Sequence, residues 1–283
     1  MDITCVVDDA VRPGSPFWGE HGLAFLIETE AGRLLFDTGQ SGTVLLHNLE
    51  LLGVDPATID ALVISHAHYD HTGGLPALLE RVRLGTPLYA NPDLFRERFS
   101  RQEGRARSVG VSLTRDELAA RLTLCLSGTP QEILPGIWTT GKITSRPEPE
   151  GRSAHHLVRV GGIFAPDLYR DDMALVLECK GAAITPLLVL LCGCCHAGLL
   201  NTLAHVQRVF ERPIVTLAGG LHLASATADH QQRVGKVLAE MEAVQRVYPN
   251  HCTGEAAFVS LLLTLGPSIV RPCPAGTKLD LGV

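Results

Sequence analysis

The sequence lacks an excess of basic residues and a long uninterrupted apolar run. Its 30 acidic residues exceed its 24 lysines and arginines, and the formal net charge is −6. General nucleic-acid binders are usually basic, so we expect no nucleic-acid partner. The most apolar stretch, AITPLLVLLCGCC, is interrupted by Pro186 and Gly193 and is too short to span a bilayer, so we expect no membrane partner.

The sequence also lacks the features of a secretory leader. The first residues, MDITCVVDDAV, contain early aspartates and no basic segment. The eight cysteines therefore predict reduced thiols rather than a disulfide framework. Hydrophobic residues make up 46% of the 283 positions, which indicates a well-filled core. We predict a compact, soluble, cytoplasmic protein.

Short apolar runs alternate with helical patterns along most of the chain. Strands are predicted over residues 2–7, 23–29, 32–39, 61–65, 173–178, 184–193, 213–223 and 246–250, and a closing strand over 276–283. Helices are predicted over residues 41–54, 75–82, 202–210, 230–244 and 255–266. This alternation predicts a layered α/β architecture.

Residues 91–155 differ in composition, and we interpret them as an insertion or lid on a single domain of residues 1–283. The segment is dense in arginine near its start and polar near its end. Its arginines either attract an anionic substrate or form a solvated helix face with acidic neighbours, and we favour the helix face. These arginines are Arg96, Arg98, Arg101, Arg105 and Arg107, and their acidic neighbours are Asp93, Glu97 and Glu103.

The clearest chemical signal is the loop ISHAHYDHTGG, which places His66, His68, Asp70 and His71 within six positions. The loop follows an apolar strand and ends at two glycines, a context that favours a built site over a chance histidine-rich surface loop. Imidazole and carboxylate groups are ligands of zinc and similar ions. Histidines two positions apart can converge on one ion, while Asp70 and His71 turn toward a second.

Three later histidines also follow apolar strands: His196 in LLCGCCHAG, His222 in LAGGLHL and His251 in YPNHCTG. Strand ends in α/β layers converge on one edge of the molecule, where sites are usually built. Four ligands do not complete two metal shells, so we expect His196 and His251 to bind metal. For His222 three roles stay open: binding a metal, orienting a ligand or touching the substrate.

The motif SHAHYDHTGGL resembles the HxHxDH signature of the metallo-β-lactamase-fold superfamily, and LLFDTGQSG resembles the strand that precedes it. The segments EHGLAFLIE, DDMALVLE, GCCHAGLLNT, GGLHL and PNHCTG resemble a branch of metal-dependent hydrolases related to archaeal dihydropteroate synthases of methanopterin biosynthesis. The resemblance covers almost the whole chain and implies a four-layer αββα sandwich with a dinuclear metal site. It implies that His66 and His68 hold a first metal, and that Asp70, His71 and His251 hold a second.

Two segments depart from the superfamily pattern. Where the superfamily usually supplies another histidine, this chain reads YRDDMALV, so Asp171 or Asp172 is a candidate substitute. Where a bridging aspartate usually follows a glycine, the chain reads CGCCHAG, which places Cys194 or His196 near the bridging position. A thiolate metal site or a redox pair is also open for the adjacent cysteines Cys194 and Cys195.

The resemblance implies one or two zinc ions, with iron or manganese as alternatives. A divalent ion lowers the pKa of bound water to about 7. We therefore predict a metal-dependent hydrolase that uses a metal-bound hydroxide, oriented by Asp70, on a small ester, lactone, thioester or phosphoester. The alternatives are a pterin transferase, whose anionic substrate would suit the arginine-rich segment, and a metal-binding redox protein.

Overall fold

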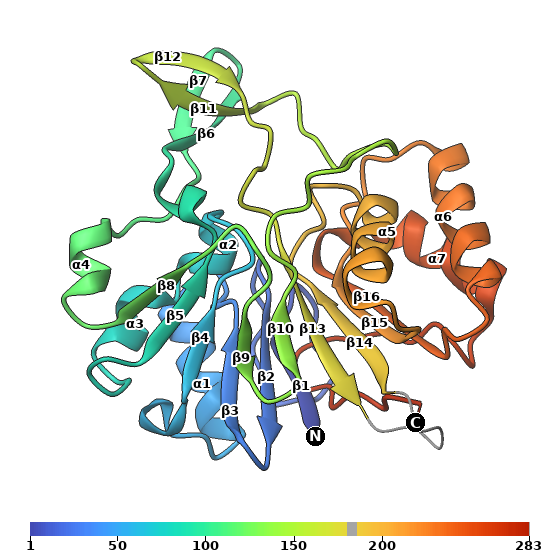
Figure 1. Cartoon of the computed structure of the whole chain (residues 1–283), viewed down its shortest axis with the longest axis horizontal. Helices are drawn as coiled ribbons and strands as arrows, with labels where there is room; N and C mark the ends of the chain where they lie inside the picture. The colour runs from blue at the N-terminus through green and yellow to red at the C-terminus, as the bar shows by residue number, and fades with distance from the viewer. Residues whose placement is uncertain (180–185, 283) are drawn as a thin grey trace.

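The computed structural model describes residues 1–179 and 186–282 and arranges them around two large mixed sheets (Figure 1). The first sheet contains, in order, β1 (Asp2–Val7), β2 (Ala24–Thr29), β3 (Gly32–Phe36), β4 (Ala61–Val63), β5 (Pro87–Ala90) and β8 (Thr123–Leu126). The second contains, in order, β16 (Arg246–Asn250), β15 (Ile214–Gly220), β14 (Leu187–Cys192), β13 (Ala174–Cys179), β10 (Ile137–Thr139) and β9 (Glu132–Leu134).

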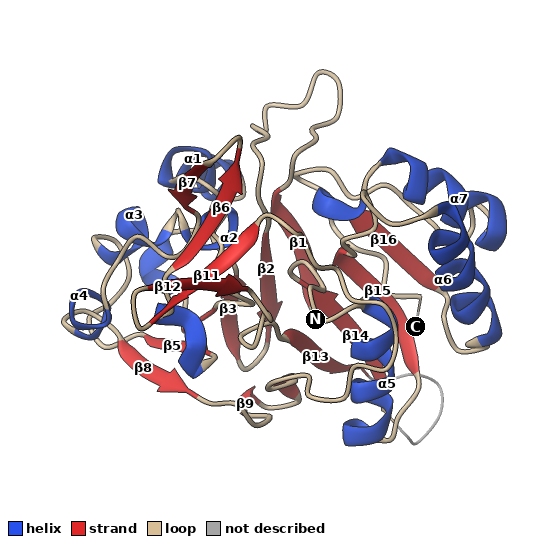
Figure 2. Ribbon diagram, turned by 90° about the horizontal axis from the view of Figure 1, so that it is seen from above, coloured by secondary structure: helices blue, strands red, loops and turns tan. Residues whose placement is uncertain are grey.

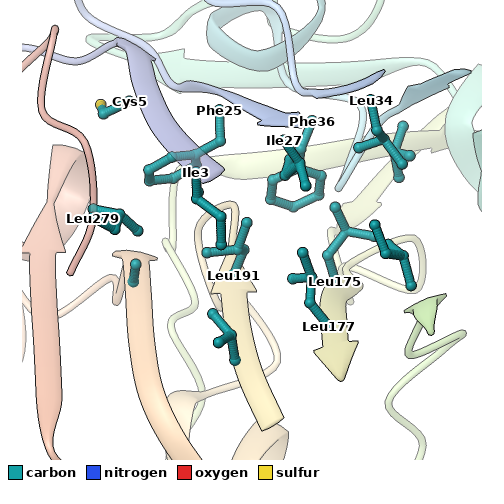
Figure 3. Close-up of a cluster of buried hydrophobic side chains, with 14 of the residues drawn as sticks. Ile3, Cys5, Phe25, Ile27, Leu34, Phe36, Leu175, Leu177, Leu191 and Leu279 are labelled. Carbon is teal, nitrogen blue, oxygen red and sulfur yellow. The ribbon is translucent and has the colours of Figure 1, made fainter. Parts of the chain in front are cut away.

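The main core lies between these two sheets. Figure 3 shows side chains of the first sheet, among them Ile3 and Phe25, facing Leu175 and Leu191 of the second, and all four are completely buried. The outer face of each sheet packs against helices through a separate apolar cluster. The predicted four-layer αββα sandwich is therefore confirmed.

Five of the helices lie where the sequence predicts them, whereas the two short helices over residues 69–72 and 115–119 are not predicted. Ser41 caps the helix α1, where its side chain accepts a hydrogen bond from the backbone N–H of Val44. The helices on the first sheet are α1 (Gly42–Leu51), α2 (Tyr69–Thr72), α3 (Leu75–Leu79) and α4 (Arg115–Ala119), and those on the second are α5 (Leu199–Phe210), α6 (Ala228–Glu240) and α7 (Glu255–Leu265). Within the described residues, none is long and apolar enough to cross a membrane.

A third, smaller sheet projects above the sandwich (Figures 1 and 2). It contains, in order, β12 (Ile163–Pro166), β11 (His156–Val160), β6 (Arg98–Gln102) and β7 (Arg105–Ser108). The helix face predicted for the arginine-rich segment is therefore wrong. Glu103 and Gly104 both adopt positive φ, at 50° and 76°, and close a two-residue hairpin turn between β6 and β7.

The segment 91–155 contributes to the sandwich as well as to the projecting sheet. β8 forms the far edge of the first sheet, and β9 and β10 extend the second. The projecting sheet itself is formed by residues 98–108 and 156–166. Each of these two segments continues into the rest of the chain at both of its ends.

The end of the chain runs beside β1. Leu279 donates a backbone hydrogen bond to Ile3, and Cys5 donates one to Thr277, but only a single bridge, between Thr4 and Lys278, has strand geometry. The predicted closing strand is thus reduced to one bridge. The predicted start of β14 at residues 184 and 185, and the turn before it, lie outside the described residues.

Candidate metal centre

Three histidines from both sheets form the first group of converging donors. His66 and His68 lie in the loop after β4, whereas His196 follows β14. Nδ1 of His68 lies 3.1 Å from Nε2 of His66 and 3.2 Å from Nε2 of His196. Burial lowers the pKa of each imidazole well below its ordinary value. These histidines are therefore neutral, which is the form that binds a metal ion.

A second group lies beside the first and contains Asp70, His71, Cys194 and His251. Nε2 of His71 lies 3.3 Å from Nε2 of His251 and 3.2 Å from Sγ of Cys194. Oδ2 of Asp70 lies 3.3 Å from Nε2 of His251 and 3.6 Å from Nε2 of His71. Burial alone would raise the pKa of Asp70, but the neighbouring histidines hold it well below its usual range, so the carboxylate is charged.

The outer ring nitrogen of four of these histidines is held by a neighbouring group. Metal-binding histidines almost always have such a partner, which fixes the ring and its tautomer. Nδ1 of His66 lies 2.9 Å from Oγ of Ser65, Nδ1 of His71 lies 2.7 Å from Asp37, Nδ1 of His196 lies 3.0 Å from the Gly151 carbonyl, and Nδ1 of His251 lies 2.7 Å from Asp9.

These contacts test whether the residues fit a metal ion. Carboxylates and carbonyls only accept hydrogen bonds, so Nδ1 of His71, His196 and His251 must carry the proton. Nε2 of the neutral His196 ring then directs a lone pair toward Nδ1 of His68, 3.2 Å away, where a cation would stabilise it. Burial alone would lower the pKa of His251, but Asp70 and Asp9 raise it well above its ordinary value. The second group therefore attracts positive charge, and both groups fit a divalent ion.

Asp37 connects the ends of β3 and β4, and the HxHxDH loop begins at the end of β4. Asp37 follows β3 and accepts hydrogen bonds from the backbone N–H and the hydroxyl of Ser65, both at 2.7 Å, besides contacting His71. Gly193, after β14, lies so close that a Cβ there would approach Oγ of Ser65 to 2.1 Å. The close contact between the two sheets at this edge thus requires a glycine.

Several residues of the centre have unusual backbone conformations. Positive φ is uncommon for residues other than glycine, and such strain tends to occur at functional sites. The residues concerned are Asp37 (60°), Tyr169 (45°), Cys195 (55°), His222 (49°) and His251 (47°).

Comparison with known proteins gives the family of the chain. The family model of the metallo-beta-lactamase superfamily matches residues 18–163, about half of the chain. The protein belongs to this superfamily. Its fold implies binding of divalent metal, in agreement with the two donor groups.

Two relatives are similar along nearly their whole length. The 7,8-dihydropterin-6-methyl-4-(beta-D-ribofuranosyl)-aminobenzene-5'-phosphate synthase of Methanocaldococcus jannaschii is 29% identical over 264 residues, which are 90% of this chain and 88% of the synthase. The crystal structure of Tm1679, a metal-dependent hydrolase of the beta-lactamase superfamily, is 29% identical with a TM-score of 0.82, and the match covers 99% and 98% of the two chains. Zn²⁺-bound PqqB from Methylobacterium extorquens shares the fold, at 14% identity and a TM-score of 0.58 over 99% and 100% of the chains.

Asp171 and Asp172 hold the loops that carry the histidines of this superfamily centre. Asp171 accepts a hydrogen bond of 2.7 Å from the N–H of Ala67, between the first two histidines of the motif, and Asp172 accepts one of 2.7 Å from Ala197. Burial raises the pKa of Asp172 to about 7. Among the described residues, neither carboxylate lies in a donor group, and the third imidazole of the first group is that of His196.

His222 lies at the margin of the first group. One of its ring nitrogens lies within 4.8 Å of the donors of Cys194 and His196, and its Nδ1 has no hydrogen-bond partner among the described residues. The side chain also lines a cavity of about 350 Å³ together with Arg152 and His230. This position is compatible with each of the roles predicted for it.

Arg98 has neither of the roles considered for the arginine-rich segment. Its side chain is only 1% exposed and forms ion pairs with Asp167 and Asp171. Because Asp171 also holds the N–H of Ala67, Arg98 links the projecting sheet to the histidine loop. Arg101, Arg105 and Arg107 are exposed, and the guanidinium of Arg107 lies 5.2 Å from the ring centroid of Tyr69.

Four other residues at the centre are not predicted by any pattern in the sequence. Asp9 contacts both His251 and His21, the latter at 2.9 Å, and Nε2 of His21 lies 3.4 Å from Oδ2 of Asp70. Tyr169 stacks on His196 with ring centroids 4.2 Å apart, and its hydroxyl lies 3.0 Å from Nδ1 of His156. These residues come from loops and from the projecting sheet, where no strand-end pattern marks them.

Proposed function

We propose that the protein is a metal-dependent hydrolase that cleaves an ester-type bond in a small anionic molecule. The observation that carries the proposal is the pair of adjacent donor groups, one with three neutral imidazoles and the other with a charged carboxylate. Two adjacent ions can hold both the attacking and the leaving oxygen of a displacement. The likeness to the hydrolase Tm1679 over 99% of this chain supports the same class of reaction.

When bound, divalent ions supply Lewis-acid polarisation and lower the pKa of water. The chain supplies the shape and the charge of the site. Asp70 directs a carboxylate between His71 and His251, where it contributes negative charge and orientation. Asp37 and Asp9 fix the rings of these two histidines, so that the donors are placed before substrate arrives.

The projecting sheet and the loop before it act in this proposal as a lid on a single domain. The carbonyl of Gly151 contacts His196, and the ring of His156 lies 4.8 Å from that of His68, so the segment covers the centre directly. Arg107, above Tyr69 of the HxHxDH motif, offers positive charge beside the site. An anionic substrate is therefore favoured, and exclusion of water strengthens its interactions.

A panel of small substrates tests the proposal. The protein, loaded with zinc and with its metal content measured, is assayed on nitrophenyl carboxylic esters, nitrophenyl phosphoesters, lactones and thioesters. We expect turnover of at least one class, with loss of turnover on chelation and recovery on addition of zinc. Fully metal-loaded protein that leaves every class intact would contradict the proposal.

A second candidate is a pterin synthase, supported by the likeness to the Methanocaldococcus jannaschii synthase over 90% of this chain. In that reaction the metals would activate a pyrophosphate leaving group. The test is incubation with a dihydropterin pyrophosphate and a ribofuranosyl-aminobenzene phosphate, followed by mass spectrometry. A joined product favours the synthase, whereas unjoined pterin alcohol favours the hydrolase.

A further inference from the structure

His156 begins the strand β11 of the projecting sheet and lies beside the first donor group. The centroid of its ring is 4.8 Å from that of His68, in an edge-to-face arrangement, and 6.3 Å from that of His196. Its side chain is half-buried, whereas the neighbouring His155 is exposed. The projecting sheet therefore places an imidazole next to the residues that would hold the first ion.

Tyr169 fixes the orientation of this imidazole. Its hydroxyl lies 3.0 Å from Nδ1 of His156 and accepts a hydrogen bond of 3.0 Å from the backbone N–H of Ser153. Tyr169 is itself completely buried and has little freedom to move, because its ring stacks on that of His196 and its backbone N–H donates to Asp167 at 2.7 Å. The tyrosine therefore holds His156 in one place above the centre.

These contacts also determine which nitrogen of His156 carries a proton. The hydroxyl of Tyr169 has one proton to donate, its oxygen already accepts the N–H of Ser153, and Nδ1 of His156 is the acceptor within reach. Nδ1 therefore accepts, and Nε2 carries the N–H. Within the part of the chain that the structure describes, the hydrogen bond at Nδ1 is the only one of this ring, so the Nε2–H donor is free.

A purely structural role for this ring would be to cover His68. Nε2 of His68 is buried and has no hydrogen-bond partner among the described residues, and an edge-to-face pair of rings allows its N–H to meet the face of the neighbouring ring. Such a contact requires the ring of His156 but not its Nε2–H. Substitutions can therefore separate covering His68 from donating a hydrogen bond.

We propose that His156 binds the substrate, donating a hydrogen bond from Nε2 to an anionic oxygen, and that Tyr169 is the residue that positions it. An ion in the first group attracts such an oxygen, and a donor fixed beside it before the substrate arrives gains affinity without reorganisation. The inference rests on the anionic substrate of the proposed function.

The affinity of the zinc-loaded protein for inorganic phosphate, measured by titration calorimetry, tests the proposal without requiring turnover. His156→Phe keeps a ring beside His68 but removes the donor. We expect its phosphate Kd to rise about 10-fold at unchanged zinc content, since a hydrogen bond to a charged group contributes at least that factor. His156→Gln lacks the ring but retains an N–H donor, and its affinity should be close to that of the wild type. The matched control is His155→Phe, which should bind phosphate like the wild type.

Tyr169→Phe tests the positioning role, because it keeps the ring on His196 but removes the hydroxyl. Phosphate binding should weaken in this variant but should not weaken further when Tyr169→Phe is added to His156→Phe, since Tyr169 acts through His156. Additive losses in the double variant would contradict this role.

Equal phosphate affinity in the wild type and His156→Phe, including the absence of measurable binding in both, would overturn the proposal. Native affinity in His156→Phe with weakened binding in His156→Gln would also overturn it, because the ring alone would then matter. Either result would leave the hydrolase proposal standing, since turnover in the substrate panel is measured separately.

Discussion

The two donor groups are built from the same strand ends but differ in charge. The first contains three buried neutral histidines, and its outer contacts are a hydroxyl at Ser65 and a carbonyl at Gly151. The second contains the charged Asp70, and its outer contacts are the carboxylates of Asp37 and Asp9. Because opposite charges attract strongly in a buried site, the second group should bind a divalent ion more tightly than the first.

The largest effect should follow Asp70→Asn, which preserves the shape of the side chain but removes its charge. We expect loss of the second ion and a fall in kcat of more than about 100-fold. Mutating a residue that only holds a metal ligand in place can already lower activity by about 100-fold, and Asp70 is itself a donor. Metal analysis and kcat on the substrate found in the panel measure both. The comparison variant is Asp172→Asn, whose side chain holds Ala197 and lies outside the groups; its loss should be smaller. Near-native kcat and full metal content in Asp70→Asn would show that this aspartate is structural.

His251→Ala should remove most of the second ion while the first remains, because Asp70, His71 and Cys194 are left as an incomplete set. Metal content per chain is the measurement. His205 on α5 and His230 on α6 provide matched controls, since both lie on helices outside the groups. Equal metal loss in all three variants would mean that the effect is general destabilisation rather than loss of a ligand.

Asp9→Asn tests the outer carboxylates that distinguish the second group. Asp9 contacts Nδ1 of His251, so its neutralisation should lower metal affinity at the second group by about 10-fold and leave the first unchanged. Competition with a metal-binding dye measures this. The control is Asp60→Asn, an exposed carboxylate paired with Arg83. If both variants bind metal like the wild type, the outer carboxylates do not tune the site.

The smallest effect should follow Arg107→Gln, which removes an exposed charge beside Tyr69. We expect KM for an anionic substrate to rise about two- to fivefold with kcat unchanged, since exposed charges contribute about 1 kcal/mol or less. Arg105→Gln removes a charge of the same exposed hairpin and should leave KM unchanged. An unchanged KM in Arg107→Gln would exclude a role for this arginine in attracting substrate.

The sequence contained enough information for the sandwich and for the donors that follow strands. His66, His68, Asp70 and His71 were found because one short loop holds them, and His196 and His251 because parallel strands end at the same edge. These signals are local, or follow from the alternation of strands and helices, and the structure brings all six side chains together.

The remaining features depend on contacts that local patterns do not encode. The alternating charges of residues 96–107 predict a helix face, but the turn formed by Glu103 and Gly104 makes this segment the hairpin of β6 and β7. The local pattern predicts a solvated Arg98, but its partners Asp167 and Asp171 lie about 70 residues away in sequence. The contacts of Asp9 with His251 span 242 positions, and only the folded chain shows them.

The most direct test of two unlike metal sites is anomalous diffraction from crystals of the zinc-loaded protein. The account predicts two separate peaks, one among His66, His68 and His196 and one among Asp70, His71, Cys194 and His251. Lowering the zinc concentration should weaken the first peak before the second, because the second group carries the negative charge. A single peak at saturating zinc, or zinc bound away from these side chains, would contradict the account.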